Sequence, residues 1–205
     1  SANEYMNTVT SFSASMISSL NGDTKAAAKA SNQAIIDMSD NANKMGTDMS
    51  LIQSAYQGFA KQNYTMLDNL KLGYGGTKTE MERLLKDAEK ISGIKYDISN
   101  LNDVYSAIHV IQTEMGITGT TAAEAEKTIS GSVNAMKGAF ENVITGFGNA
   151  DADIKTLCQN VVDSLSTVIK NITPVIQNII SVLPTVVDSL LGAIVEMFPT
   201  LLKSV

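Results

Sequence analysis

The fold is decided by an apolar stretch from residue 161 to residue 205, which reads VVDSLSTVIKNITPVIQNIISVLPTVVDSLLGAIVEMFPTLLKSV. Apolar residues recur here every eleven positions, in four columns. Eleven residues make three turns of about 3.67 residues, close to the natural pitch of an α-helix, so each column runs almost straight along one helix. The columns contain Val161, Ile172, Leu183, Ile194 and Val205; Leu165, Ile176, Val187 and Phe198; Val168, Ile179, Leu190 and Leu201; and Ile169, Ile180, Leu191 and Leu202. We expect a sister chain, a surrounding wall or a lipid surface to cover them.

All three prolines of the chain, Pro174, Pro184 and Pro199, lie in this stretch. A proline inside a helix removes one backbone donor and clashes with the carbonyl four residues back. Because the eleven-residue phase continues across Pro174 and Pro184, the pattern predicts kinked but continuous helical rod segments.

The composition favours elongated helices over a compact domain. The 205 residues include only 5% aromatics and no Trp, which limits the area that each core position can bury. The net charge of −6 disfavours nucleic-acid binding, which needs Lys and Arg to neutralise phosphates. The single cysteine permits no internal disulfide. The chain begins Ser-Ala-Asn-Glu, so we expect it to be a piece of a longer protein.

Glycine clusters and capping residues divide the rest of the chain into predicted helices. These cover residues 1–22, 24–44, 49–62, 64–72, 78–91, from Asn100 or Asn102 to 115, 121–144, and from 151 onward. Thr77 with Glu80, and Thr121 with Glu124, have the spacing of capping boxes, and Asp151 is the expected N-cap of the last helix. Residues 94–99 are expected to be irregular, with a strand as the alternative.

The predicted fold class is therefore all-α, with extended helices, Gly breaks and Pro kinks, arranged as hairpins or as a coiled-coil-like bundle. Three segments are expected: 1–45, rich in Ala and Ser; 46–150, a helical core region; and 151–205, the apolar rod.

No stretch has the pattern of a nucleotide or metal site. A P-loop needs Gly directly before its Lys and another five positions earlier, but Thr77 and Leu72 stand there. In a calcium loop starting at Asn149, the glycine and closing glutamate positions hold Ile154 and Asn160. No cofactor, metal or catalytic residue is expected, and the chain is not expected to be an enzyme.

Two single residues are expected to be structural. His109, the only histidine, has apolar neighbours and no Cys or second His nearby in sequence to share a metal. Cys158 adjoins Leu157 and Val161 on the rod, so we expect a small buried apolar group. The aromatic residues Tyr56, Phe59, Tyr64 and Tyr74 have few cations beside them, which favours packing over base stacking.

The middle of the chain resembles a known family. Residues 44–85 (KMGTDMSLIQSAYQGFAKQNYTMLDNLKLGYGGTKTEMERLL), 117–122 (ITGTTA) and 128–140 (TISGSVNAMKGAF) resemble the tape measure proteins of phage tails, especially of phages that infect Gram-positive gut bacteria. The resemblance is long and ordered, over about residues 30–150. The residues that carry it most clearly are Tyr56, Gly58, Phe59, Tyr64, Leu67, Gly73, Tyr74, Gly75, Gly76, Thr77 and Glu80. Residues 151–205 are similar to the family only in character.

The resemblance implies a structural protein of the virion, assembled in the bacterial cytoplasm and lying in the tail lumen. A few copies lie along the tube axis, contact the tail tube protein and the tail tip or baseplate proteins, set the tail length, and are ejected before the DNA. The residues independently favour a small parallel homo-oligomer, preferably a trimer, that buries the apolar columns.

A membrane-active helical protein, pore-forming or translocator-like, is the alternative. The stretch between Lys170 and Asp188 is uncharged and close to the short end of a membrane span. Its Asn, Thr, Gln, Ser and Pro residues weaken that interpretation. In this alternative, residues 161–205 insert into the bilayer. The two interpretations overlap, because the resemblance to tape measure proteins also implies contact with the host membrane on ejection.

Overall fold

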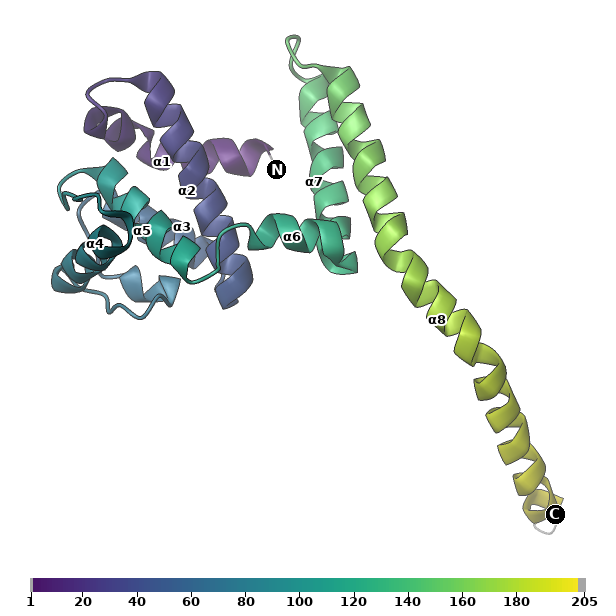
Figure 1. Cartoon of the computed structure of the whole chain (residues 1–205). Coiled ribbons are helices and arrows are strands. Elements are labelled where there is room, and N and C mark those ends of the chain that lie inside the picture. Colours follow the sequence, from purple (N-terminus) through teal and green to yellow (C-terminus); the bar gives the residue numbers. More distant parts are fainter. Residues whose placement is uncertain (1, 203–205) are drawn as a thin grey trace. The chain divides into compact units, whose positions relative to one another are not determined.

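The computed structural model describes the backbone of residues 2–202 and the side chains of residues 6–193 and 195 (Figure 1). The chain is 78% helical, with eight α-helices and no strand in the part described, which confirms the all-α fold class. The elements are α1 Ala2–Ser19, α2 Thr24–Met45, α3 Met49–Phe59, the short 3₁₀-helix η1 Leu67–Leu70, α4 Lys78–Ser92, α5 Leu101–Glu114, α6 Thr120–Lys127, α7 Ile129–Phe147 and α8 Ile154–Leu202.

The chain forms two compact units, unit 1 over Ser1–Glu124 and unit 2 over Ala125–Val205. Neither boundary expected from the sequence, after residue 45 or after residue 150, coincides with this division. The expected boundary at 150 falls inside unit 2 because α7 and α8 pack against each other on either side of it.

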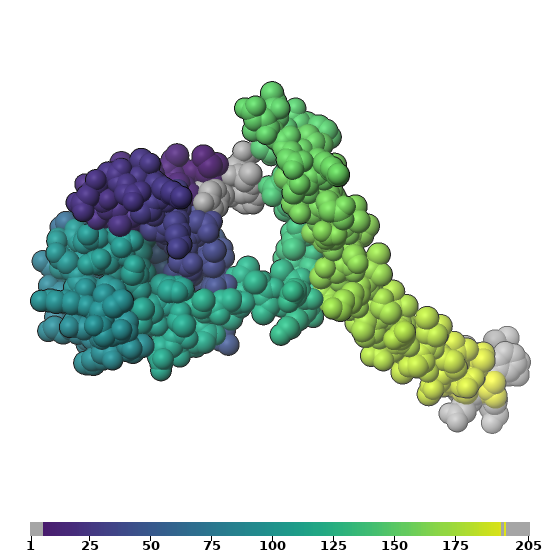
Figure 2. Space-filling view, turned by 45° about the horizontal axis from the view of Figure 1, so that its top comes forward, coloured from purple at the N-terminus to yellow at the C-terminus, as the bar shows by residue number. Residues whose placement is uncertain are grey.

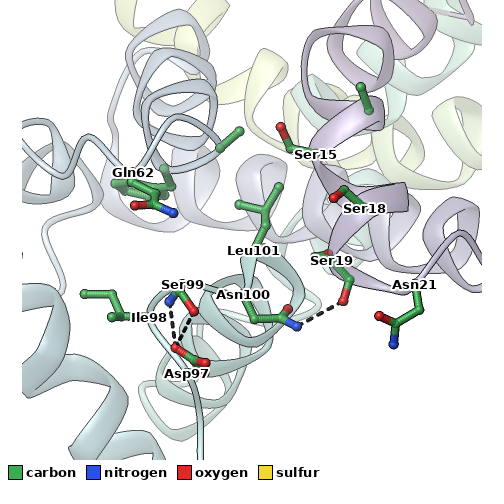
Figure 3. A pocket seen from close by; sticks show the side chains of 13 residues that line it. Ser15, Ser18, Ser19, Asn21, Gln62, Asp97, Ile98, Ser99, Asn100 and Leu101 are labelled. Atoms are coloured by element: carbon green, nitrogen blue, oxygen red, sulfur yellow. Dashed lines mark hydrogen bonds between the residues drawn. The ribbon is translucent and has the colours of Figure 1, made fainter.

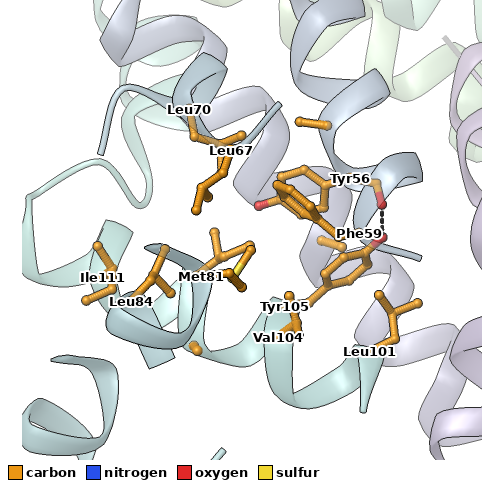
Figure 4. Close-up of a cluster of buried hydrophobic side chains, with 14 of the residues drawn as sticks. Tyr56, Phe59, Leu67, Leu70, Met81, Leu84, Leu101, Val104, Tyr105 and Ile111 are labelled. Atoms are coloured by element: carbon orange, nitrogen blue, oxygen red, sulfur yellow. Dashed lines mark hydrogen bonds between the residues drawn. The ribbon is translucent and has the colours of Figure 1, made fainter. Parts of the chain in front are cut away.

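Unit 1 has a dense core, so the prediction that the composition favours elongated helices over a compact domain is wrong for this part of the chain. The few aromatic residues are concentrated: Tyr105 lies 4.8 Å from Tyr56 and 5.6 Å from Phe12, measured between ring centroids. Phe59 lies 5.7 Å from Tyr56 on the same helix. Leu and Met side chains from η1 and α4 complete the cluster (Figure 4). A few aromatic residues can therefore supply a core when they converge on one place.

Several helix ends follow the local sequence. Asp48, Thr77 and Asn100 cap α3, α4 and α5, each accepting a hydrogen bond from a backbone N–H of the first turn. These caps confirm the expected starts, because a cap joins residues only two or three positions apart. The predicted capping box at α4 is only half formed, since the Glu80 carboxylate accepts from the Gly75 N–H.

The predicted helix over residues 64–72 is wrong except for the single 3₁₀ turn of η1. The Asn63 side chain accepts hydrogen bonds from both the N–H and the hydroxyl of Thr65. This local turn competes with an α-helical start.

The predicted helix over residues 121–144 is divided in two. Thr121 does not cap it, because α6 already begins at Thr120. Thr128 ends the first piece and caps the second, accepting from the Gly131 N–H at 2.9 Å. Asp151 does not cap α8 either: Asp153 accepts from the N–H and the hydroxyl of Thr156.

Unit 2 contains a hairpin in which α7 lies beside the first part of α8 (Figure 1). At the closed end, a Cβ built on Gly146 would lie 2.5 Å from Leu157 Cδ1, so the two helices approach closely there. Toward the other end, the Asn171 amide donates to the carbonyls of Glu126 and Thr128 at 3.1 and 3.0 Å. The helix α8 then continues through Pro174, Pro184 and Pro199, which confirms the expected continuity of the rod.

Candidate association surface

Helix α8 exposes large apolar side chains over most of its described length. Every described side chain from Thr173 onward is exposed. Among the predicted column residues that are exposed, the exposed fraction runs from 45% at Val187 to 63% at Ile180. Figure 2 shows this part of α8, in yellow-green, without another element of unit 2 against it. A surface of this kind marks a site that another molecule covers.

The predicted columns differ in how far α7 covers them. Val161, Val168 and Ile172 are half-buried beside α7. The remaining column residues with described side chains are exposed: Leu165, Ile169, Ile176, Ile179, Ile180, Leu183, Val187, Leu190 and Leu191. Ile194, Phe198, Leu201 and Leu202 lie on α8, but their side chains, like the whole of Val205, are outside the described residues.

The apolar side chains of α8 also follow a repeat of seven, which the eleven-residue description missed. Alternating steps of three and four residues join Val162, Leu165, Ile169, Ile172, Ile176, Ile179, Leu183, Val186 and Leu190. This is the spacing of the a and d positions of a coiled coil. Val162 and Val186, exposed by 58% and 49%, belong to this stripe and to none of the four columns. Counting steps of seven would have found them in the sequence.

Cys158 is exposed, so the prediction that it is buried is wrong. The physical reason is that α7 covers a different face of α8 here, the face on which the neighbouring residue Leu157 is half-buried. Cys158 is four positions before Val162, so the thiol lies at the beginning of the seven-residue stripe.

The same helix is long and apolar enough to cross a membrane. Within Ile154–Ala193 the most apolar window of 18 residues has a mean hydropathy of 1.5, and none of that window is buried. Between Lys170 and Asp188 it carries no ionisable side chain. By composition, lipid and other apolar helices are both possible neighbours of this segment.

The residues that carry the family resemblance are mostly packing residues of unit 1. Tyr56, Phe59, Tyr64 and Leu67 are all at least 95% buried. A Cβ on Gly76 would lie 2.2 Å from the Thr65 carbonyl oxygen, so only glycine fits there. The remaining members, Gly58, Gly73, Tyr74, Gly75, Thr77 and Glu80, lie at the end of α3 and at the start of α4.

Tyr74 and Glu80 are fixed by one arginine. The Arg83 guanidinium lies 4.3 Å from the centre of the Tyr74 ring and also binds the Glu80 carboxylate. Hydrogen bonds from Arg83 and from the Gly75 N–H lower the pKa of Glu80 to about 2. Partial burial and the hydrogen bond to Asp87 raise the pKa of Tyr74 to about 12. These charges hold the turn before α4 together.

Unit 1 has a polar hollow of about 580 Å³ between the end of α1, the loop after α3 and the start of α5 (Figure 3). Asn100 joins two of these elements. Its amide donates to the Ser19 carbonyl of α1 at 3.0 Å, and its Oδ1 accepts from the Asp103 N–H in the first turn of α5. Asp97 accepts from the N–H and the hydroxyl of Ser99. The Asn100 amide thus holds α1 against α5, and Asp97 stabilises the turn before α5.

His109 lies in a second hollow of unit 1 and is paired with an acidic residue that sequence reasoning did not find. Its Nδ1 lies 2.8 Å from Oδ1 of Asp37 on α2, 72 residues away along the chain. The Asp37 side chain is 2% exposed and the His109 side chain 34%. The Asp37 hydrogen bond raises the pKa of His109, against a smaller effect of burial. Nowhere in the described part of the chain do three His, Cys, Asp or Glu side chains gather as metal ligands.

Comparison of the chain with protein-family models, curated proteins and solved structures found no match.

Proposed function

We propose that this chain is part of a phage tail tape measure protein, with a structural role rather than a catalytic one. In this role, α8 lies in the tail lumen beside copies of itself, contacts the tail tube and tail tip proteins, and leaves before the DNA. The observation that carries the proposal is the uncovered apolar surface of one uninterrupted helix, continuing through three prolines.

The geometry of α8 suits a ruler. An α-helix rises about 1.5 Å per residue, so the 49 residues of α8 extend over about 74 Å. Length in such a rod is proportional to residue number, which is the property that a tape measure needs. Unit 1 is compact and adds less length per residue, so we assign the measuring role to α8 and to rods like it.

The seven-residue stripe favours copies of the same helix as its cover. Ile169, Ile172, Ile176 and Ile179 occupy successive a and d positions, and isoleucine at both positions favours three or four strands over two. Neighbouring positions are also apolar, for example Ile180 and Val187, so the apolar face is wider than two strands would bury. A parallel trimer is the smallest bundle consistent with this pattern.

The direct test is tail length after deletion of Thr173–Ile194 from the phage gene that encodes this chain. The deletion removes two eleven-residue units, preserves the apolar phase and leaves the α7–α8 hairpin untouched. Electron microscopy should show tails shorter by about 33 Å. Duplicating the same segment is the matched control, and tails should then be about 33 Å longer. Unchanged lengths in both variants would refute the ruler role.

A membrane-active protein is the second candidate, favoured by the apolar helix Ile154–Ala193. Its uncharged part, residues 171–187, would extend over about 26 Å, slightly less than a bilayer core of about 30 Å. Flotation of the purified protein with neutral phosphatidylcholine vesicles separates the candidates. A tape measure bundle stays soluble as an oligomer, whereas a membrane-active protein floats and loses flotation when Ile179 is replaced by Asp.

A further inference from the structure

The second hollow of unit 1 has a volume of about 540 Å³ and lies between α2 and α5. Its walls are largely apolar, with Ala30, Ala34, Ile94 and Val110 among the lining residues. A concave, mostly apolar site with a few polar groups is the usual form of a small-molecule site. None of these residues belongs to α8, so the site is independent of the tape measure proposal.

One polar group at this hollow, the imidazole of His109, is held in one orientation. Asp37 fixes His109 through Nδ1, and Gln33 donates to the same carboxylate oxygen at 3.0 Å. The hydrogen bonds that His109 makes within the described residues use Nδ1, so the other ring nitrogen, Nε2, remains for a ligand. The imidazole also lines a smaller neighbouring hollow. An imidazole held by a carboxylate in this way presents Nε2 as an acceptor when neutral and as a donor when protonated.

The charges around the hollow favour an acidic ligand. The imidazole of His109, when protonated, compensates the charge of Asp37, and Lys29, two turns earlier on α2, adds a positive charge to the lining. Asp40 on α2 is engaged by backbone N–H groups of residues 119 and 121, and Glu114 of α5 lines only a neighbouring hollow. No other carboxylate lines the site itself.

We propose that this hollow binds a small organic acid with an apolar body, whose carboxylate hydrogen-bonds Nε2 of His109. The apolar part lies against the alanines of α2 and against Ile94 and Val110. Lys29 contributes at longer range, since its position is two helical turns from Asp37.

The test uses the full chain, in which His109 gives the single histidine signal in an NMR spectrum. Phenylacetate is the probe, and phenylacetamide, of the same shape without charge, is the matched control. Phenylacetate should bind, shift the His109 resonance and raise its titration midpoint, because a bound carboxylate stabilises imidazolium. His109→Gln, which can still donate to Asp37, should weaken binding by about tenfold or more.

Lysine variants separate a specific effect from a general one. Lys29→Met should weaken phenylacetate binding, whereas Lys25→Met, on the same helix but outside the lining, should not. Equal binding of the acid and the amide with an unmoved His109 midpoint would overturn the proposal, and so would the absence of binding by phenylacetate at millimolar concentration.

Discussion

The carboxylate of Asp40 accepts a hydrogen bond from the backbone N–H of Thr121 at 2.9 Å, across 81 residues of sequence. Its second oxygen accepts from the Gly119 N–H at 2.6 Å, and the Asp40 side chain is almost completely buried. An acidic side chain of α2 therefore caps α6, a role that a residue of the adjoining loop usually fills.

We expect Asp40→Ala to lower the free energy of unfolding of unit 1 by about 2–4 kcal/mol, because the cap is lost and two backbone donors lose their partner. Asp23→Ala is the matched control, since Asp23 caps α2 locally on the surface, and it should cost only about 1 kcal/mol. Urea unfolding followed by circular dichroism measures both. Equal effects would mean that Asp40 is not a tertiary cap.

The pair His109–Asp37 should make the stability of unit 1 depend on pH. The pKa of His109 is raised in the folded protein, so the folded state binds the proton more tightly than the unfolded state. The resulting stabilisation is complete below the unfolded pKa of about 6.5 and is lost as pH rises through the folded pKa. The free energy of unfolding should therefore decrease from pH 6 toward pH 8.

The variant His109→Gln isolates this effect. Its unfolding free energy should not show the decrease between pH 6 and pH 8, because glutamine does not titrate. If the wild type and the variant have parallel profiles, the pair does not couple protonation to folding.

Two glycines of α7 offer a matched comparison of helix packing. A Cβ on Gly146 would meet Leu157 Cδ1 at 2.5 Å, whereas a Cβ on Gly138 would meet nothing within 4 Å. Gly138→Ala should stabilise the hairpin by about 0.5–1 kcal/mol through helix propensity alone. Gly146→Ala has the same propensity gain but must displace Leu157, so it should be about 1–3 kcal/mol less stable than Gly138→Ala. Hydrogen exchange of the α7 amides in the full chain measures the difference.

Cys158 reports on the direction of the proposed self-association. In a parallel, in-register bundle, the thiols of neighbouring copies lie in one layer of the seven-residue stripe. Mild oxidation with diamide should therefore link two chains through Cys158. An antiparallel pairing would place the two thiols tens of ångströms apart and would give no link.

A displaced cysteine is the control for random collision. In the double variant Cys158→Ser with Gln159→Cys, the thiol points about 100° away around the helix. Cross-linking should then be much slower. Equal rates for both positions, or a monomer at all concentrations, would contradict the parallel bundle.

Local interactions made much of the secondary structure predictable. Asp48, Thr77 and Asn100 begin helices because their side chains bond N–H groups two or three residues ahead. The continuity of α8 was predictable because the eleven-residue spacing of its apolar residues persists across Pro174 and Pro184. The candidate surface was largely predictable for the same reason, although the seven-residue stripe with Val162 and Val186 was missed.

The remainder depended on contacts between distant parts of the chain. The convergence of Phe12, Tyr56 and Tyr105 gave unit 1 a core that a low aromatic content did not predict. Neither the cap by Asp40 nor the pairing of Asp37 with His109 has a local signal, because each joins residues more than 70 positions apart.

The sequence by itself therefore determined where helices begin and which stripe of α8 is apolar, since both follow from spacing within a few turns. Only the tertiary structure decided which carboxylates are buried, which of them binds the imidazole of His109, and which face of α8 remains uncovered. Those features depend on how helices pack, and packing brings together side chains whose separation along the chain carries no information about their distance in space.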